Sequence, residues 1–408
     1  MKSLPKIIFY LIVVGVVFSA IKLYLAQAEL EDENIEGQYG WYYKLEFIAD
    51  IMMSVASVLS FVLYRKFFPL YISVCWILMV VFVTLSSVND LSFFAKRPSY
   101  FYSIRGIGTF VNIGIIFFAA NTGYLQKLLK VFYYLCYAFI IGGVINLGQV
   151  GIGSSRLQYL GAIKDIAVYL IWVFPFFFLQ DETDKKKNII NLGIYAIMFI
   201  FILSTQARTY LIIYALFLIV KFREQLRSKN SFLVIIGGVI LVAGAFLLLS
   251  SSSLAKTADD AFSMLSERTG EDSRSGQIIE FLNQWDTDYL LQGVGPLKTW
   301  YWTNINDYYF GLDNQFLLIG WFAGLPAVFT YIYFILKIYF TKSESLLFEE
   351  IKGIKLMVGI WILACLGFAI YISVSTTLYY NFLTLLMGIQ VCRYTMLKEV
   401  EVEVDQGG

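Results

Sequence analysis

Gly293-Val294-Gly295-Pro296 and Asp313-Asn314-Gln315-Phe316-Leu317 close the longest polar interruption in this chain, which runs from Ser251 to Asp313. On either side of it the sequence is almost continuously apolar. Gly293–Pro296 predicts a tight turn, because it lacks both the GxGxxG spacing of a dinucleotide site and the Lys-Ser/Thr ending of a phosphate loop. Asp313 and Asn314 mark the point where the chain returns to an apolar segment.

The composition indicates what kind of protein surrounds this stretch. Of the 408 residues, 59% are hydrophobic and only 15% are charged, and the mean hydropathy is +0.69. A soluble domain carries roughly 25% charged residues. We therefore predict an integral, polytopic membrane protein with the lipid bilayer as its surroundings. The net charge of +1 gives no reason to expect a nucleic-acid partner.

A membrane-crossing helix needs about 20 apolar residues. We predict an all-α fold with about twelve such helices in a single transmembrane domain, residues 1–408. The predicted spans are Ile7–Leu25, Leu45–Tyr64, Leu70–Val88, Ile104–Asn121, Leu128–Val150, Tyr159–Leu179, Ile189–Ser204, Thr209–Val220, Phe232–Ser250, Asn314–Leu336, Ile354–Tyr371 and Ser375–Val391. Ile189–Phe222 is divided in two because a single helix would be about 51 Å long, far beyond a hydrocarbon core of about 30 Å. We expect the first span to be kept as an anchor and not removed as a secretory signal.

The charged residues predict the orientation of these spans. With both termini in the cytoplasm, most of the 31 lysines and arginines fall on the inner side, as the positive-inside rule requires. The first outer loop is instead acidic, with five carboxylates between Glu29 and Glu36. We therefore predict a multi-pass membrane protein with both termini in the cytoplasm. Residues 251–313 would then lie outside as a periplasmic or extracellular loop.

Within the loop, two segments have apolar residues at helical spacing, and an aromatic run follows them. The first segment has Ala258, Ala261, Phe262 and Leu265, and the second has Ile278, Phe281, Leu282 and Trp285. The aromatic run is Trp300, Tyr301, Trp302, Tyr308, Tyr309 and Phe310. We predict two short amphipathic helices and an interfacial aromatic belt, which together form a cap on the outer face.

Arginines near the outer face are the first candidate functional residues. Arg208 stands between two short spans, where a guanidinium close to the hydrocarbon needs a partner or a water-filled cavity. Arg274 opens the second loop helix, and Arg97, Arg105 and Arg156 lie on the same side. Arginine grips phosphate bidentately, so this set suits a diphosphate ligand. The alternatives are snorkelling to lipid head groups for Arg208, pairing with Glu271 or Asp272 for Arg274, and interfacial anchoring for the others.

Asp313 and Asn314 allow two interpretations. An Asp-Asn pair before an apolar run is typical of a helix N-cap. Asp313 could also stand at the mouth of a cavity and accept a proton from a sugar hydroxyl. The two interpretations are compatible, since Asn314 could cap the helix while Asp313 acts as the base. The loop carboxylates Glu280, Asp286, Asp288 and Asp307 have no spacing that selects a metal, so we predict no metal site.

Histidine is absent from the chain, which excludes an imidazole base. The four cysteines, Cys75, Cys136, Cys365 and Cys392, fall in apolar segments without a CxxC pair, so we interpret them as buried small hydrophobes.

This order of features resembles the bacterial O-antigen polymerase/ligase superfamily, of Wzy and WaaL type. The matching motifs are the Ser-x-x-x-Arg-Thr hairpin at Ser204–Thr209, Arg274 at a loop helix start and the Gly-x-Gly turn at Gly293–Gly295. An Asp-Asn-x-x-Leu return follows at Asp313–Leu317, and Gly320 and Gly324 come after it. The motifs cover Ile189 to Leu336, and the remainder matches only as hydropathy.

The resemblance implies a membrane glycosyltransferase of GT-C-like architecture, located in the bacterial plasma (inner) membrane. It would use undecaprenyl-diphosphate-linked oligosaccharides and no cofactor. Arg208 and Arg274 would then hold the donor diphosphate, and Asp313 would stand where ligases have a catalytic histidine. These three form the expected catalytic set, with Arg156, Arg105, Arg97 and Asn314 as substrate contacts. A chain without histidine fits the polymerase branch better than the ligase branch. A flippase and a chain-length regulator are the expected protein partners, and a flippase or transporter of lipid-linked glycan is the alternative from another class.

Overall fold

The structure is a computed structural model that describes residues 3–28, 42–88, 107–150, 156–180, 185–205, 208–227, 273–295, 298–303, 307–309, 314–342, 353–367 and 377–393. The chain forms two compact units. Unit 1 consists of Met1–Lys22, Gly40–Phe132 and Asp272–Gly408. Unit 2 consists of Leu23–Tyr39 and Tyr133–Glu271.

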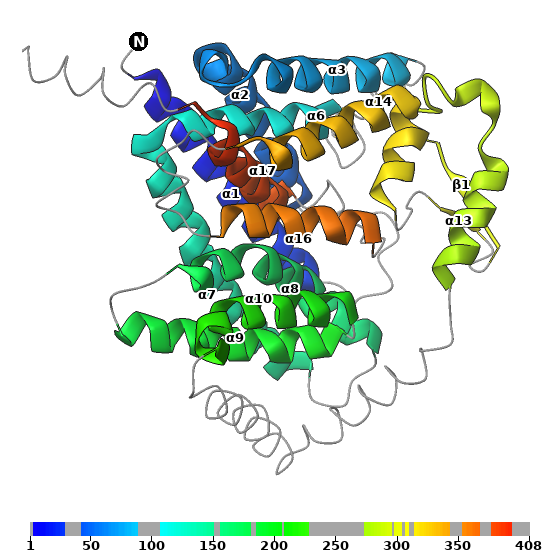
Figure 1. The fold of residues 1–408 in the computed structure, drawn as a ribbon. Helices are drawn as coiled ribbons and strands as arrows, with labels where there is room; N and C mark the ends of the chain where they lie inside the picture. The colour runs from blue at the N-terminus through cyan, green and yellow to red at the C-terminus, as the bar shows by residue number, and fades with distance from the viewer. Residues whose placement is uncertain are drawn as a thin grey trace, which may run out of the picture. The chain divides into compact units, whose positions relative to one another are not determined.

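The described residues are mostly helical, as predicted (Figure 1). The α-helices are α1 (Leu4–Ala28), α2 (Tyr42–Tyr64), α3 (Leu70–Ser87), α6 (Ile107–Asn112), α7 (Thr122–Val150), α8 (Arg156–Leu179), α9 (Lys185–Thr205), α10 (Arg208–Arg227), α13 (Ser273–Gln284), α14 (Gln315–Phe340), α16 (Ile354–Gly367) and α17 (Thr377–Val391). Short 3-10 helices are η1 (Arg65–Phe67), η3 (Ile113–Ala120) and η5 (Thr287–Tyr289). The strands β1 (Trp300–Trp302) and β2 (Asp307–Tyr309) pair in an antiparallel hairpin that the sequence did not predict.

Five of the described helices are long and apolar enough to cross a membrane, so the chain has the features of an α-helical membrane protein. These segments are Leu4–Leu23, Phe47–Phe67, Leu70–Ser87, Gly123–Ile145 and Phe316–Phe340. Shorter apolar helices occupy Phe110–Ala120, Ile166–Leu179, Lys187–Ile202, Tyr210–Phe222 and Ile354–Ala364. The predicted span Phe232–Ser250 lies outside the described residues, and a total of twelve stays a prediction.

Helix α3 shows how such a helix divides its surface. One side is buried in unit 1, with Ile72, Met79 and Val83 completely inaccessible. The other side exposes large apolar residues at helical spacing, namely Leu70, Val74, Ile77, Leu78, Val81 and Leu85. In water such a stripe would be costly, whereas hydrocarbon accommodates it. The exposed stripe is therefore the surface expected against lipid.

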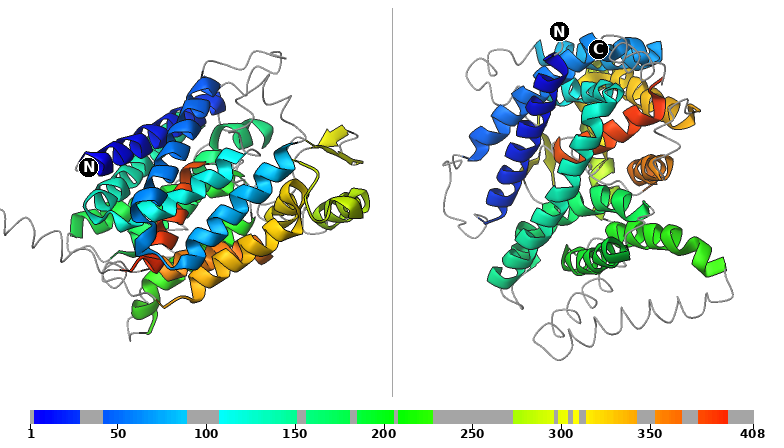
Figure 2. Two further views of the ribbon diagram at one scale, coloured as in Figure 1. Left: turned by 90° about the horizontal axis from the view of Figure 1, so that it is seen from above. Right: turned by 90° about the vertical axis from the view of Figure 1, so that its left-hand side faces the viewer.

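The core of unit 1 is built around η3, whose residues from Ile113 to Ala119 are all buried. The ring of Phe117 lies 5.2 Å from that of Phe61 and 5.8 Å from that of Trp76, between centroids. Helix α17 packs against η3 at Gly388, where a Cβ atom would lie 2.4 Å from the carbonyl oxygen of Ile116. Helices α3 and α14 run side by side (Figure 2).

Unit 2 contains α8, α9 and α10 packed against one another. Tyr195 of α9 stacks on Tyr214 of α10 with ring centroids 4.2 Å apart. The two tyrosines exchange hydrogen bonds, because each hydroxyl donates to the other's backbone carbonyl, at 2.7 and 3.0 Å. Helix α9 ends at Thr205 and α10 begins at Arg208, so the prediction of two helices within Ile189–Phe222 is confirmed.

Candidate functional site

Helix α14 begins immediately after Asn314, at the predicted return from the loop. The side-chain oxygen of Asn314 accepts hydrogen bonds from the backbone N–H groups of Phe316 and Leu317, at 3.0 and 3.1 Å. These contacts satisfy two of the donors that a helix start leaves unpaired. Asn314 is therefore an N-cap in this structure, as one of the two interpretations predicted. Asp313 lies outside the described residues.

The cap role of Asn314 gives a stability prediction. Asn314→Ala removes both acceptor contacts and is expected to destabilise the protein by about 1 kcal/mol. Asn314→Asp keeps an oxygen in the same place, so it should unfold close to the wild-type temperature. Thermal unfolding of the purified full-length protein in detergent measures both. Equal destabilisation by Ala and Asp would rule out capping as the reason.

Helix α14 is interrupted one-third of the way along its length. Gly324 has φ 80° and ψ 169°, which is not helical, and Pro326 follows two residues later. An unbroken helix would join the N–H of Leu325 to the carbonyl of Trp321, four residues earlier. Here the Trp321 carbonyl instead accepts from the N–H of Val294 at 2.8 Å, and the Leu325 N–H donates to the carbonyl of Leu290 at 2.8 Å. The loop thus supplies partners for two of the backbone groups that the break releases.

The loop segment that docks on this break contains the predicted tight turn. Gly293 and Gly295 have φ of 72° and 96°, so the prediction of a turn here is confirmed. A Cβ atom on Gly293 would lie 2.5 Å from the backbone of Phe322, and one on Gly324 would lie 2.2 Å from the carbonyl oxygen of Leu291. Neither position has room for a side chain. The two backbones can therefore approach closely enough to exchange hydrogen bonds.

An aromatic cluster attaches α13 to the first part of α14. Phe281 of α13 is fully buried, and its ring centroid lies 4.9 Å from Trp321 and 5.6 Å from Trp300. Trp285 covers Gly320, where a Cβ atom would come within 2.6 Å of the indole. Figure 1 shows α13 and β1 beside the yellow first part of α14. These contacts anchor this part of the predicted cap to the first part of α14.

The predicted helix at Ile278–Trp285 is confirmed, but its apolar residues are not all buried. Phe281 is enclosed, whereas Leu282 is 45% exposed. The other predicted loop helix, at Ala258–Leu265, lies outside the described residues.

The hairpin changes the interpretation of the aromatic run. Trp300 is only 2% exposed and belongs to the core of the cap, so it is not an interfacial belt residue. Gln284 holds β1 through both amide atoms, donating to the Tyr301 carbonyl at 2.7 Å and accepting from the Tyr301 N–H at 2.8 Å. Glu280 accepts from the N–H of Thr303 at 3.0 Å. Glu280 is thus engaged in fixing the hairpin.

The predicted arginines occupy the starts of helices. Arg208 is the first residue of α10, Arg156 is the first of α8, and Arg274 is the second of α13. Arg274 and Asn314 belong to unit 1, whereas Arg208 and Arg156 belong to unit 2. The structure brings together the helices that carry Arg274 and Asn314, through Phe281 and Trp321. The expected pairing of Arg208 with Arg274 stays a prediction.

Arg97 and Arg105 lie outside the described residues. Among the residues that are described, no group of three or more cysteine, aspartate or glutamate side chains could hold a metal. Cys75, Cys136 and Cys392 are buried thiols, as predicted, and the Cys365 side chain is not described. Burial raises the pKa of the Cys392 thiol, just beyond α17, to about 12.

One buried polar stripe was missed by the sequence analysis. Asp50, Ser54 and Ser57 follow one another along α2 at helical spacing, and they are 4%, 8% and 0% exposed. Ser54 donates to the side-chain oxygen of Asn112 at 2.8 Å, and Ser57 donates to the Asn112 carbonyl at 3.2 Å. The i, i+4, i+7 spacing was a detectable signal. A carboxylate within a membrane span is a functional candidate by default. Asp50 is therefore a further candidate functional residue, in addition to those predicted from the sequence.

Comparisons with known proteins do not indicate a family or a function for this chain. No protein-family model, curated protein or solved structure matches this chain.

Proposed function

We propose that this chain is a polymerase that joins undecaprenyl-diphosphate-linked oligosaccharide repeat units on the outer face of the bacterial plasma membrane. Its product would be an O-antigen, a capsule or an exopolysaccharide. The proposal is supported by the apolar helices, by the large polar segment before α14 and by the order of Arg208, Arg274 and Asp313 along the chain. The donor carries its activation in the diphosphate bond, so the reaction needs no nucleotide or other cofactor.

The observation that carries most weight is the position of the arginines at helix starts. A helix N-terminus has unpaired backbone N–H groups and a partial positive charge, both of which favour an anion. An arginine in the first turn is not stabilised by this partial positive charge, because the two positive charges repel each other. Arg208 and Arg274 occupy such positions on helices of 20 and 12 residues. A diphosphate would gain from the guanidinium and the helix end together.

The chemistry follows from these groups. The acceptor hydroxyl oxygen attacks the anomeric carbon of the donor, and the bond from that carbon to the diphosphate oxygen breaks. The lipid diphosphate leaves with the bonding electron pair, and Arg208 and Arg274 stabilise its charge. Asp313 accepts the proton from the hydroxyl. Attack opposite the leaving group would invert the anomeric centre, by the same logic as inverting glycosidases.

The contacts of the neighbouring residue Asn314 support a defined position for Asp313. Asp313 directly precedes Asn314, which is fixed by its two hydrogen bonds to the start of α14. The loop and the aromatic cluster hold that part of α14 in turn. A base needs a defined position relative to its substrate, because proton transfer requires hydrogen-bond contact.

Two other functions remain as alternatives. A ligase would transfer a finished glycan to a different acceptor with the same groups. A transporter is favoured by one observation, the interruption of α14 at Gly324, since transporters use broken helices at their binding sites. In this chain, however, the Trp321 carbonyl and the Leu325 N–H, both released by the break, are hydrogen-bonded to the loop. Those groups are thus not free to bind a transported substrate.

The glycan profile of a deletion strain separates these functions. Loss of a polymerase should leave a single repeat unit on the cell surface, because flipping and ligation continue. Loss of a flippase should leave no repeat unit, and loss of a ligase should leave polymer that accumulates on the lipid carrier. Gel electrophoresis of surface and carrier-linked glycan measures all three. A null strain with long surface chains would contradict the proposal.

A further inference from the structure

Most of the described cations of unit 1 gather at one end of its helices. They are Lys6, Arg65, Lys66, Lys127, Lys130, Lys337, Lys342, Lys355 and Arg393. Contacts join the helix ends that carry them: the Asn121 side chain donates to the Tyr64 hydroxyl at 3.0 Å, and the Arg393 N–H donates to the Phe67 carbonyl at 2.8 Å. The carboxylates whose side chains are described in this unit lie toward the other end, at Asp50, Glu280, Asp286 and Asp288. The positive-inside rule assigns the cationic end to the cytoplasm.

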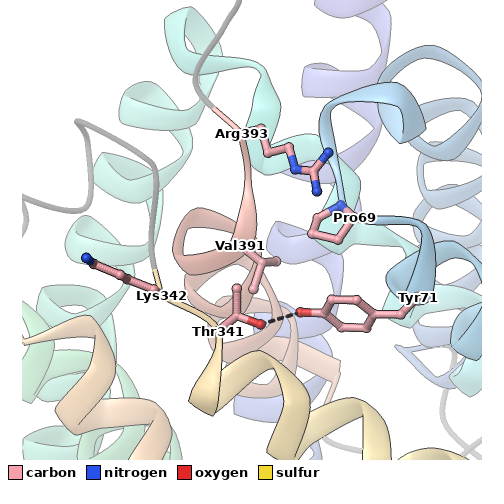
Figure 3. A pocket seen from close by; sticks show the side chains of 6 residues that line it. All are labelled: Pro69, Tyr71, Thr341, Lys342, Val391 and Arg393. Carbon is pink, nitrogen blue, oxygen red and sulfur yellow. Dashed lines mark hydrogen bonds between the residues drawn. The ribbon is translucent and has the colours of Figure 1, made fainter.

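A pocket of about 230 Å³ opens at this cationic end (Figure 3). Its lining comes from the start of α3 and from the chain at and just beyond the ends of α14 and α17, namely Pro69, Tyr71, Thr341, Lys342, Val391 and Arg393. Pockets for whole small molecules measure about 300–1,000 Å³. The space therefore suits one small polar head group and is too small for an oligosaccharide. It also lies at the opposite end of α14 from Asn314.

The two hydroxyls in the pocket already use their protons. The Thr341 hydroxyl donates to the carbonyl of Lys337 at 2.7 Å. The Tyr71 hydroxyl, 2.9 Å from the Thr341 oxygen, must then be the donor in that contact, because a hydroxyl has one proton. Figure 3 shows this hydrogen bond across the pocket. This hydrogen bond holds α3 and the end of α14 together, and Arg393 is the donor left for a ligand. The Lys342 side chain points away from the other lining residues and adds charge only at the rim.

These two cations are not required to cap the helices beside them. The carbonyls of Lys337 and Ile338 accept from the N–H of Thr341, at 3.0 and 3.2 Å. The Gln390 side chain donates to the carbonyls of Ile338 and Tyr339, at 2.9 and 3.0 Å. Among the described residues, no carboxylate lies within ion-pair distance of Arg393 or Lys342. Within the described part of the chain, no carboxylate therefore neutralises their charge.

The residues flanking the pocket indicate where that anion comes from. Leu70, next to Pro69, is 78% exposed, and Phe340, next to Thr341, is 73% exposed. Both belong to helices that are apolar enough to cross a membrane. A free phosphate would gain nothing from these side chains, whereas acyl chains would cover them.

We propose that this pocket binds the phosphate of an anionic phospholipid from the cytoplasmic leaflet. Arg393, whose backbone is tied to Phe67, grips the phosphate through its planar guanidinium. Lys342 adds charge from the rim, and the acyl chains lie against Leu70 and Phe340. Basic pockets on the cytoplasmic side of membrane helices suit such head groups. This site is independent of the proposed polymerase activity at the other end of α14.

Lipid retention by the purified full-length protein tests the proposal. Native mass spectrometry would titrate the protein in detergent with phosphatidylglycerol, phosphatidylcholine, glycerol phosphate or inorganic phosphate. Wild type should bind phosphatidylglycerol at least about tenfold more tightly than phosphatidylcholine, which corresponds to about 1.4 kcal/mol. The double variant Arg393→Gln/Lys342→Gln should lose that preference. Lys130→Gln is the matched control, because it removes an exposed charge from the same end without touching the pocket.

A second pair of variants separates the lipid from a free anion. Leu70→Ser/Phe340→Ser should weaken phosphatidylglycerol binding several-fold and leave glycerol phosphate binding unchanged. The proposal is overturned if the Arg393/Lys342 variant keeps the lipid preference, or if Lys130→Gln loses it equally. Binding of inorganic phosphate as tightly as of phosphatidylglycerol would also overturn it. Size-exclusion profiles like that of wild type confirm that each variant is folded.

Discussion

Replacing Arg208 or Arg274 with Ala is expected to abolish long-chain polysaccharide while the protein level stays normal. Under the proposed function, each change would remove a positive charge that stabilises the leaving diphosphate. Loss of one such donor typically lowers kcat by about 10²–10³-fold, or about 2.7–4 kcal/mol. A chain of many units needs repeated turnovers, so a reduction of this size should eliminate the long products. Electrophoresis of surface glycan from a complemented deletion strain measures the distribution.

Arg227→Ala is the matched control for this experiment. Arg227 is the last residue of α10, so the substitution removes the same charge from the opposite end of the helix that begins with Arg208. It should leave chain length unchanged. Arg208→Lys and Arg274→Lys should recover only part of the activity, because an ammonium lacks the bidentate geometry of guanidinium. Full-length polymer from both alanine variants would show that these arginines do not hold the diphosphate.

Asp313→Asn belongs to the same experiment, because asparagine caps a helix as well as aspartate does. If Asp313 is the base, the Asn variant loses polymer although it keeps any capping contact. Retained polymer would assign Asp313 a structural role. Since Asn314 already caps α14, the structure gives Asp313 no need to do so.

Gly324→Ala is expected to give the largest loss of stability, at least about 3 kcal/mol. The backbone at φ 80° and ψ 169° is accessible almost only to glycine and costs other residues about 1–3 kcal/mol. In addition, the new Cβ would lie 2.2 Å from the carbonyl oxygen of Leu291, which is backbone and cannot turn aside. The loop must then leave the break, and the hydrogen bonds at Trp321 and Leu325 are lost. Thermal unfolding of the purified protein measures the effect.

Gly276→Ala provides the control within the same cap. Gly276 lies in α13, and a Cβ atom there would meet nothing within 4 Å. Alanine favours helix by about 1 kcal/mol over glycine, so this variant should be neutral or slightly more stable. Gly293→Ala should resemble Gly324→Ala, and the double variant should cost less than the sum because both break one interface. Additive effects would mean that the two glycines do not share a contact.

The helices of this chain were predictable because their signal is local. A long run of apolar residues predicts a membrane helix without knowledge of the rest of the chain. Comparing the length of Ile189–Phe222 with the thickness of the bilayer correctly predicted two helices, α9 and α10. The turn at Gly293–Pro296 and the cap at Asn314 were also local, since each depends on the preferences of one or two residues. The hairpin was not local. Trp300–Trp302 becomes a strand because Gln284 and Asp307–Tyr309 supply its partners.

The sequence by itself determined that this is a helical membrane protein, and it placed the start of α14 at a polar pair of residues. Hydrophobic burial and capping need no knowledge of distant residues, so both could be recognised along the chain. Only the tertiary structure decided that α14 breaks at Gly324 and that the loop segment Leu290–Val294 packs against the break. A released backbone carbonyl and N–H must find partners, and here Val294 and Leu290, some thirty residues earlier, provide them.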